Sequence, residues 1–287
     1  SITEFGRSAF SGCTSILAFD FAKFTALTTI GQEAFSGCIG LGYGKDTVIT
    51  MGDAVASLGD KAFYGCTSIK AIDLKNVASI GYACFFNCSE LKSATHSATE
   101  VGAYAFEMCS GLTGSLTIPN GIKAINSFSF RRCGFAGNLF LPMGLEKIKD
   151  RAFAGTKFKG ELNIPSTVTA IGDFAFFEAE FNGTLVLPKE LISLGSSAFD
   201  NCWRLSGVVE IPENIVAIPS SLFYGCRGIE GIVLHKDVEV IESQAFYNCY
   251  GINSIVSKAK NPPTIASNSF SGVAKDNFTL EVPEASV

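Results

Sequence analysis

Cysteine is the residue best able to do chemistry in this chain of 287 residues, which contains ten of them. A cysteine can act as a nucleophile, bind zinc or form a disulfide, and each role requires particular neighbours. Nine of the ten end one recurring phrase, of which IGQEAFSGC (30–38), LGDKAFYGC (58–66) and IESQAFYNC (241–249) are examples. The elements that carry this phrase therefore decide what the cysteines can do.

The phenylalanine of the phrase recurs along the whole chain and serves as an anchor for alignment. Successive anchors are between 21 residues (106 − 85) and 28 residues (63 − 35) apart. A period of roughly 23 residues indicates a repeat array, in which each unit can bury its apolar side only against its neighbours. The twelve anchors are Phe10, Phe35, Phe63, Phe85, Phe106, Phe130, Phe153, Phe176, Phe199, Phe223, Phe246 and Phe270.

The positions around the anchor form columns with distinct properties. The residue five positions before it is always apolar, the residue directly before it is usually Ala, and the residue two positions after it is Gly or Asn in nine of the twelve copies. Gly and Asn tolerate a left-handed backbone, as at the end of a helical turn. The other three copies have Met108, Arg132 and Glu178 there, and we expect these residues to strain or alter the turn.

Many repeats also contain a short alternating segment that Pro closes, such as TLVLP (184–188) and VVEIP (208–212). Alternation predicts a half-buried strand, which the Pro ends. We therefore predict a repeat solenoid that is β-rich with short helical turns, in which about twelve coils of roughly 23 residues form stacked parallel sheets. A single solenoid is expected over 1–287. It starts inside a repeat, because SITEFGRSAF already belongs to the phrase, and ends with an atypical closing repeat near 261–287.

The unit C-x-x-L-x-(x)-x-I-x-I-P-x-x-V-x-x-I-G-x-x-A-F-x-G resembles the BspA-type (Treponema-type) leucine-rich repeat of bacterial surface proteins. The resemblance covers essentially the whole chain and implies a solenoid of leucine-rich-repeat type. It departs from the pattern at an insertion around GYGKDTV (42–48) and at the short, irregular repeat LKSATHSATEVG (91–102). The resemblance also implies an extracellular or cell-surface location and a role in adhesion to host proteins or to other cells.

The cysteine column tolerates replacement, because three copies have Thr156, Ala179 and Val273 in its place. A metal ligand or a nucleophile cannot be exchanged for Ala or Val, whereas a small buried side chain can, and free cysteine packs as a small apolar residue. We expect mainly free, buried thiols. Bridging between stacked coils stays open as an alternative, although parallel side chains give poor geometry for a disulfide. Zinc is not expected, because the cysteines of this column are at least 21 residues apart (109 − 88).

The rest of the sequence shows no catalytic constellation. The two histidines, His96 and His235, are expected at the surface, and no nucleophile elbow, zinc-protease motif or P-loop occurs. A net charge of −5 with scattered basic residues argues against a nucleic-acid partner. No run of 18 apolar residues could span a membrane. We therefore expect a non-enzymatic protein that needs no cofactor and no metal.

Alternation within the predicted strands also marks the side chains that point outward. Phe140 and Val186 are apolar where solvent favours polar residues, and we expect them to form the centre of a protein-binding patch with Asn138, Glu161 and Asn163 as its polar rim. The predicted function is thus an interaction or adhesion module. A carbohydrate-binding surface module and a passive spacer for a further domain remain alternatives. The outward positions are Asp20, Thr50, Asp73, Thr117, Phe140, Asn163, Val186, Glu210, Val233, Val256 and Glu281.

Overall fold

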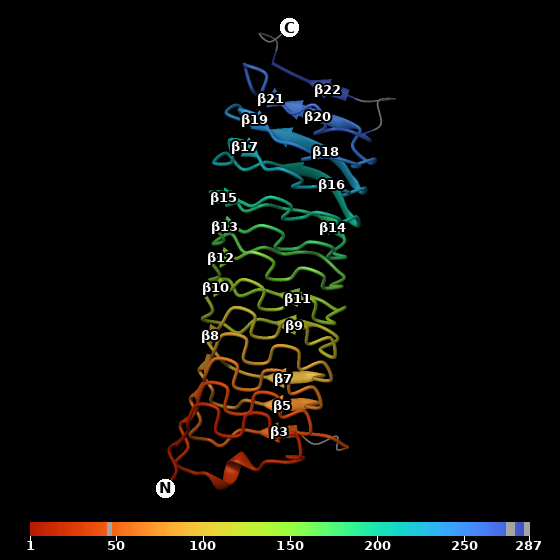
Figure 1. Cartoon of the computed structure of the whole chain (residues 1–287). Coiled ribbons are helices and arrows are strands. Elements are labelled where there is room, and N and C mark those ends of the chain that lie inside the picture. Colours follow the sequence, from red (N-terminus) through yellow and green to blue (C-terminus); the bar gives the residue numbers. More distant parts are fainter. Residues whose placement is uncertain (45–47, 274–278, 284–287) are drawn as a thin grey trace.

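The computed structural model describes residues 1–44, 48–273 and 279–283. The chain winds into coils that stack along one axis, with the N-terminus at one end of the stack and the C-terminal strand at the other (Figure 1). The predicted insertion (42–48) and closing repeat (261–287) lie partly outside the described residues. The extent predicted for a single solenoid, 1–287, therefore stays a prediction.

One side of the stack, the short-strand face, is built from strands of two residues that end five positions before each anchor. Neighbouring coils pair in parallel and in register, so that Ile30 lies beside Leu58 and Ile148 beside Ile171. The apolar column of the sequence is therefore buried from Phe5 to Ile241, whereas Ile265 in the last strand of this face is 51% exposed. The sheets are β1 (Glu4–Phe5), β2 (Thr29–Ile30), β4 (Ser57–Leu58), β6 (Ser79–Ile80) and β8 (Glu100–Val101); β10 (Ala124–Ile125), β12 (Lys147–Ile148), β13 (Ala170–Ile171) and β15 (Ser193–Leu194); and β17 (Ala217–Ile218), β19 (Val240–Ile241) and β21 (Thr264–Ile265).

The opposite side, the long-strand face, contains the alternating segments that the sequence predicted as strands. Its pairs are also parallel, and the longest are β16 and β18. Like the short-strand face, this face is divided into three separate sheets within the described residues. They are β3 (Val48–Thr50), β5 (Ala71–Asp73) and β7 (Ser93–Thr95); β9 (Leu116–Thr117) and β11 (Leu139–Phe140); and β14 (Gly183–Thr184), β16 (Leu205–Glu210), β18 (Ile229–Leu234), β20 (Ser254–Ser257) and β22 (Thr279–Glu281).

The anchor phenylalanines fill the space between the two faces. Each of the twelve stacks on the next, with ring centroids 4.9 to 5.8 Å apart and ring planes within 20° of parallel. Offset stacking at such separations is favourable beyond the burial of apolar area. Each period of the sequence therefore contributes one phenylalanine to a continuous aromatic ladder inside the solenoid.

The segment that carries the anchor is not helical, so the prediction of short helical turns is wrong. The N–H groups of Phe35 and Gly37 donate to carbonyls of the next coil, whereas those of Ser36 and Cys38 donate three residues back. The alternation arises because two residues have positive φ, Glu33 (57°) before the anchor and Gly37 (71°) after it. Tight turns therefore replace a helix and leave every second N–H free to join neighbouring coils. In the described part of the chain the one helical element is a 3-10 turn, η1 (Phe21–Lys23).

The three copies without Gly or Asn after the anchor keep the same turn. Met108, Arg132 and Glu178 have φ of 62°, 56° and 58°, and their N–H groups still donate to the next coil at 2.9 Å. A left-handed conformation is unfavourable for such residues by roughly 1–2 kcal/mol each. The hydrogen bonds and packing of the stack hold these residues in the left-handed conformation. Of the two effects expected from the sequence, strain or an altered turn, the structure shows strain in an unaltered turn.

Candidate functional site

The cysteine column lies in the core beside the anchor ladder. All ten thiols are free, and nine are buried; Cys13, in the first coil, is exposed. In eight coils the thiol donates to the carbonyl of the anchor in the preceding coil, as Cys66 does to Phe35 at 3.0 Å. The other donors are Cys38, Cys88, Cys109, Cys133, Cys202, Cys226 and Cys249.

Burial makes these thiols poor nucleophiles. It raises the pKa of Cys66 to about 12 and that of Cys109 to about 12, so the thiolate is not formed at neutral pH. The cysteines therefore pack the core and join neighbouring coils by hydrogen bonds. The sequence indicated the packing, whereas the donor role follows only from the register of the coils.

The histidines are not surface residues as predicted. His235 is buried, with 7% of its surface exposed, and His96 is half-buried. His235 occupies the place that Pro takes in other coils, where its Nδ1 accepts from the N–H of Asp237 at 3.2 Å and its Nε2 donates to the carbonyl of Ile215 at 3.1 Å. Both ring nitrogens make hydrogen bonds that stabilise this turn, so the role of His235 is structural.

The long-strand face is interrupted at two steps within the described residues. β7 is not paired with β9, and β11 is not paired with the coil that follows it. At the second step the coils are still joined up to Lys159, whose N–H donates to the carbonyl of Gly137 at 2.9 Å. Beyond this bond they separate, and they meet again where the Thr167 hydroxyl lies 2.8 Å from the carbonyl oxygen of Met143.

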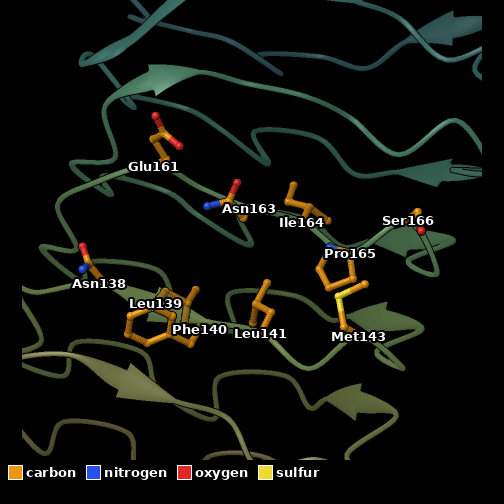
Figure 2. Close-up of a pocket in the computed structure, with 10 residues that line it drawn as sticks. All are labelled: Asn138, Leu139, Phe140, Leu141, Met143, Glu161, Asn163, Ile164, Pro165 and Ser166. Atoms are coloured by element: carbon orange, nitrogen blue, oxygen red, sulfur yellow. The ribbon is translucent and has the colours of Figure 1, made fainter.

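Between these two contacts lies a groove of about 550 Å³, which we call the Phe140 groove. Figure 2 shows Asn138 and Glu161 toward one end of it and Met143, Pro165 and Ser166 toward the other. Its lining residues are Asn138, Leu139, Phe140, Leu141, Met143, Glu161, Asn163, Ile164, Pro165 and Ser166. Hydrogen bonds between the two coils therefore hold both ends of the groove in place.

Phe140 stands on the outer side of β11, as the alternation predicted. Leu139 is buried, whereas Phe140 is 52% exposed. Met143, which is 77% exposed, adds a second large apolar side chain to the same groove. Met143 was not among the predicted residues, because it belongs to the turn after LP and not to a strand. Its apolar side chain in LPMG, at a turn where polar residues are favoured, was the signal that could have identified it.

The predicted rim residues Asn138, Glu161 and Asn163 are exposed and line the Phe140 groove. Val186 is 69% exposed but lines a separate groove of about 810 Å³ with Val208 and other residues. The structure therefore brings four of the five predicted residues together and places the fifth beyond the intervening coil.

The Phe140 groove contains little that could drive a reaction. Glu161 is its one ionisable side chain, and the other polar groups are two amides and a hydroxyl. Across residues 1–44, 48–273 and 279–283, no group of three or more His, Cys, Asp or Glu side chains could hold a metal ion. The same residues include no helix that is long and apolar enough to cross a membrane. The lining residues give the groove an apolar surface with a polar edge.

A parallel β-solenoid with an aromatic ladder and a solvent-facing sheet is the architecture of a leucine-rich-repeat protein. The chain belongs to the BspA-type leucine-rich-repeat family: the family model for a region of six repeat copies matches residues 1–113, 56–182 and 146–277. No curated protein matches the chain.

Solved structures of similar fold share little sequence with this chain. A leucine-rich repeat protein from Bacteroides ovatus is 21% identical, with a TM-score of 0.73 over 99% of this chain and 88% of that chain. The pneumococcal vaccine antigen PcpA is 17% identical, with a TM-score of 0.53 over 99% of this chain and 78% of that one. A leucine-rich repeat protein from Eubacterium ventriosum is 18% identical, with a TM-score of 0.51 over 95% and 80%. These similarities establish the fold.

Proposed function

We propose that the protein is a non-enzymatic interaction module of the bacterial surface, and that it binds a protein partner through the Phe140 groove. The observation that carries the proposal is the pair of exposed apolar side chains, Phe140 and Met143, in one groove. Apolar anchors with a polar edge are typical of the centre of protein interfaces. The surface location is inferred from the BspA-type family and from the similar fold of the pneumococcal vaccine antigen.

The energy available at Phe140 is sufficient for a binding hot spot. A phenylalanine side chain buries 150–250 Å² when covered, so covering the exposed half of Phe140 removes about 100 Å² from water. At about 25 cal/mol per Å², this contributes about 2–3 kcal/mol. Val186 could extend the contact only if the partner also reaches the neighbouring groove.

The carbohydrate-binding alternative is weakened by the contacts of several aromatic rings outside the Phe140 groove. Sugars stack on free ring faces, but the faces of Tyr104 and Phe128 cover each other at 4.4 Å between centroids. The guanidinium of Arg151 covers a face of Phe174 at 4.3 Å, and that of Arg204 covers a face of Trp203 at 4.8 Å. These rings stabilise the stack and offer few platforms to a ligand.

The test uses purified protein on fluorescent beads, which are incubated with epithelial cells and with bacterial cells. Trypsin treatment of the target cells should abolish bead binding if the partner is a protein, and periodate oxidation of surface glycans should leave it intact. Phe140→Ala should weaken binding by about 2 kcal/mol, or roughly 30-fold, without lowering the melting temperature.

Ile192→Ala is the matched control, because Ile192 is an apolar residue that is 65% exposed and lines none of the described grooves. It should bind as the parent protein does. The proposal is wrong if the parent protein binds neither cell type, if periodate rather than trypsin removes binding, or if Phe140→Ala and Ile192→Ala behave alike.

A further inference from the structure

The other interruption of the long-strand face, between β7 and β9, contains a cavity of about 330 Å³ that reaches the core. Its inner wall includes Phe106, Phe130 and Phe135, which are buried, and its edge carries hydroxyls such as those of Thr95 and Thr117. No residue of the Phe140 groove lines it. Whatever the cavity binds is therefore independent of the function proposed above.

The cavity exists because the irregular repeat lacks large core side chains. Ala94 in β7 is the register partner of Ile72 in β5, so a small side chain stands where the preceding coil has a large one. Two residues further along each strand, His96 takes the place of the buried Leu74. The smaller side chains leave room beside the aromatic rings, and a group that occupies this room gains dispersion contacts with the cavity wall.

His96 makes the space chemically specific. Its ring lies along Phe106, with centroids 6.0 Å apart and planes at 17°, and its Nδ1 is shielded from water and has no hydrogen-bond partner. Burial lowers the pKa of His96, so the imidazole is neutral at pH 7. A neutral imidazole has one N–H and one acceptor nitrogen. Whether Nδ1 carries the hydrogen or accepts one, it has no hydrogen-bond partner here.

We propose that this cavity, the His96 cavity, binds a small molecule made of a single aromatic ring with one hydroxyl group. The volume is at the lower end of the range for ligand pockets, which fits one ring and its substituent. The ring packs against the phenylalanines of the inner wall. The hydroxyl serves either tautomer of His96, because it both donates and accepts, and the broad χ2 torsion of the imidazole allows Nδ1 to turn toward it.

Neither water nor a hydrocarbon satisfies both parts of this site. Water needs several polar partners, which the buried phenylalanines of the inner wall do not supply, whereas an apolar cavity takes up compact apolar rings. A hydrocarbon ring fills the space but leaves Nδ1 unpaired, and an unpaired buried polar group is unfavourable. The hydroxylated ring is the chemical class that meets both demands.

The probes are phenol and benzene, titrated into the full chain by calorimetry and by NMR of the imidazole nitrogens. Phenol should bind at least fivefold more tightly than benzene and should shift the signals of His96, while those of the buried His235 serve as an internal control and stay in place. His96→Leu should remove the preference for phenol and leave benzene binding within twofold of the parent value.

Ala94→Ile fills the cavity with the side chain of its register partner and should weaken both probes at least tenfold. Ala71→Ile, in β5 and outside the cavity lining, is the matched control and should bind as the parent does. Equal affinity for phenol and benzene in the parent protein would overturn the role of His96. Unchanged phenol binding in Ala94→Ile, or a shift of His235 in place of His96, would overturn the site itself.

Discussion

Replacing Phe176 by Ala removes one rung from the middle of the aromatic ladder. Phe176 is fully buried and stacks on Phe153 and Phe199 at 5.6 and 5.5 Å between centroids, with the edge of Phe181 at 5.8 Å. Truncation of a buried Phe destabilises a protein by about 3–5 kcal/mol. Three aromatic contacts at about 0.5–1.5 kcal/mol each are part of this loss, so we expect a value near the upper end.

Urea unfolding measures the effect, followed by far-ultraviolet circular dichroism and by fluorescence of Trp203. This tryptophan is the only one in the chain, and it follows shortly after Phe199 in the sequence. Two probes are needed because stacked repeats can unfold in groups, and only coincident transitions justify a single free energy. Phe176→Leu, which retains most of the volume but no ring, should lose about 1–2 kcal/mol, on the scale of changes of shape in a packed core.

A loss below about 1 kcal/mol for Phe176→Ala would refute the ladder as a source of stability, since no buried Phe is truncated so cheaply unless the site is loosely packed. Equal losses for the Ala and Leu variants would show that ring stacking, and not volume, accounts for the effect. Small-angle scattering from a compact sphere would contradict the stacked architecture altogether.

Three further outcomes follow from the structure. Thiol titration of the native protein should detect chiefly Cys13, and titration after denaturation should detect close to ten thiols; recovery of two or three would mean that the column is bridged. Burial raises the pKa of Asp200 from 3.8 to about 6, so the folded state favours the protonated carboxyl by about 3 kcal/mol. This contribution to the free energy of unfolding is present in acid and is lost as the pH rises from about 4 to 6. Asp200→Asn should therefore raise the free energy of unfolding at pH 7 by up to this amount and flatten its pH dependence in that interval; a lower value at pH 7 would contradict the sign. Arg151→Lys should lose about 0.5–2 kcal/mol in the same unfolding assay, because the planar guanidinium lies over both Phe128 and Phe174, and an unchanged value would mean that this stacking is incidental.

The architecture could be predicted because its signals repeat in every coil. The period of the anchor, the apolar column five positions before it and the closing Pro each correspond to one feature of the stack, namely the ladder, the short-strand face and the end of a strand. The exposure of Phe140 was also predictable, since it follows from alternation with the buried Leu139.

The failures share a physical cause, which is that single residues take conformations set by neighbouring coils. Residues as different as Glu33 and Phe174 adopt positive φ before the anchor, with φ of 57° and 54°. Their side chains carry no preference for that conformation, and inter-coil hydrogen bonds impose it. A helical turn was therefore expected where tight turns occur. The burial of His235 was missed for a similar reason, because its two hydrogen bonds depend on the coil geometry.

Both candidate sites lie where the hydrogen-bonded ladder of the long-strand face is interrupted, on either side of the β9–β11 pair. A regular solenoid offers little for a ligand to bind, because its core is packed and its backbone groups are paired between coils. At the two candidate sites, space and an unsatisfied group arise where one coil departs from the pattern of its neighbours. In this chain the departures are visible in the sequence, as Ala94 and His96 at large apolar positions and as Phe140 and Met143 at outward ones. Irregular positions in a repeat array are therefore the first places to look for its binding chemistry, and the regular positions explain how those places are held.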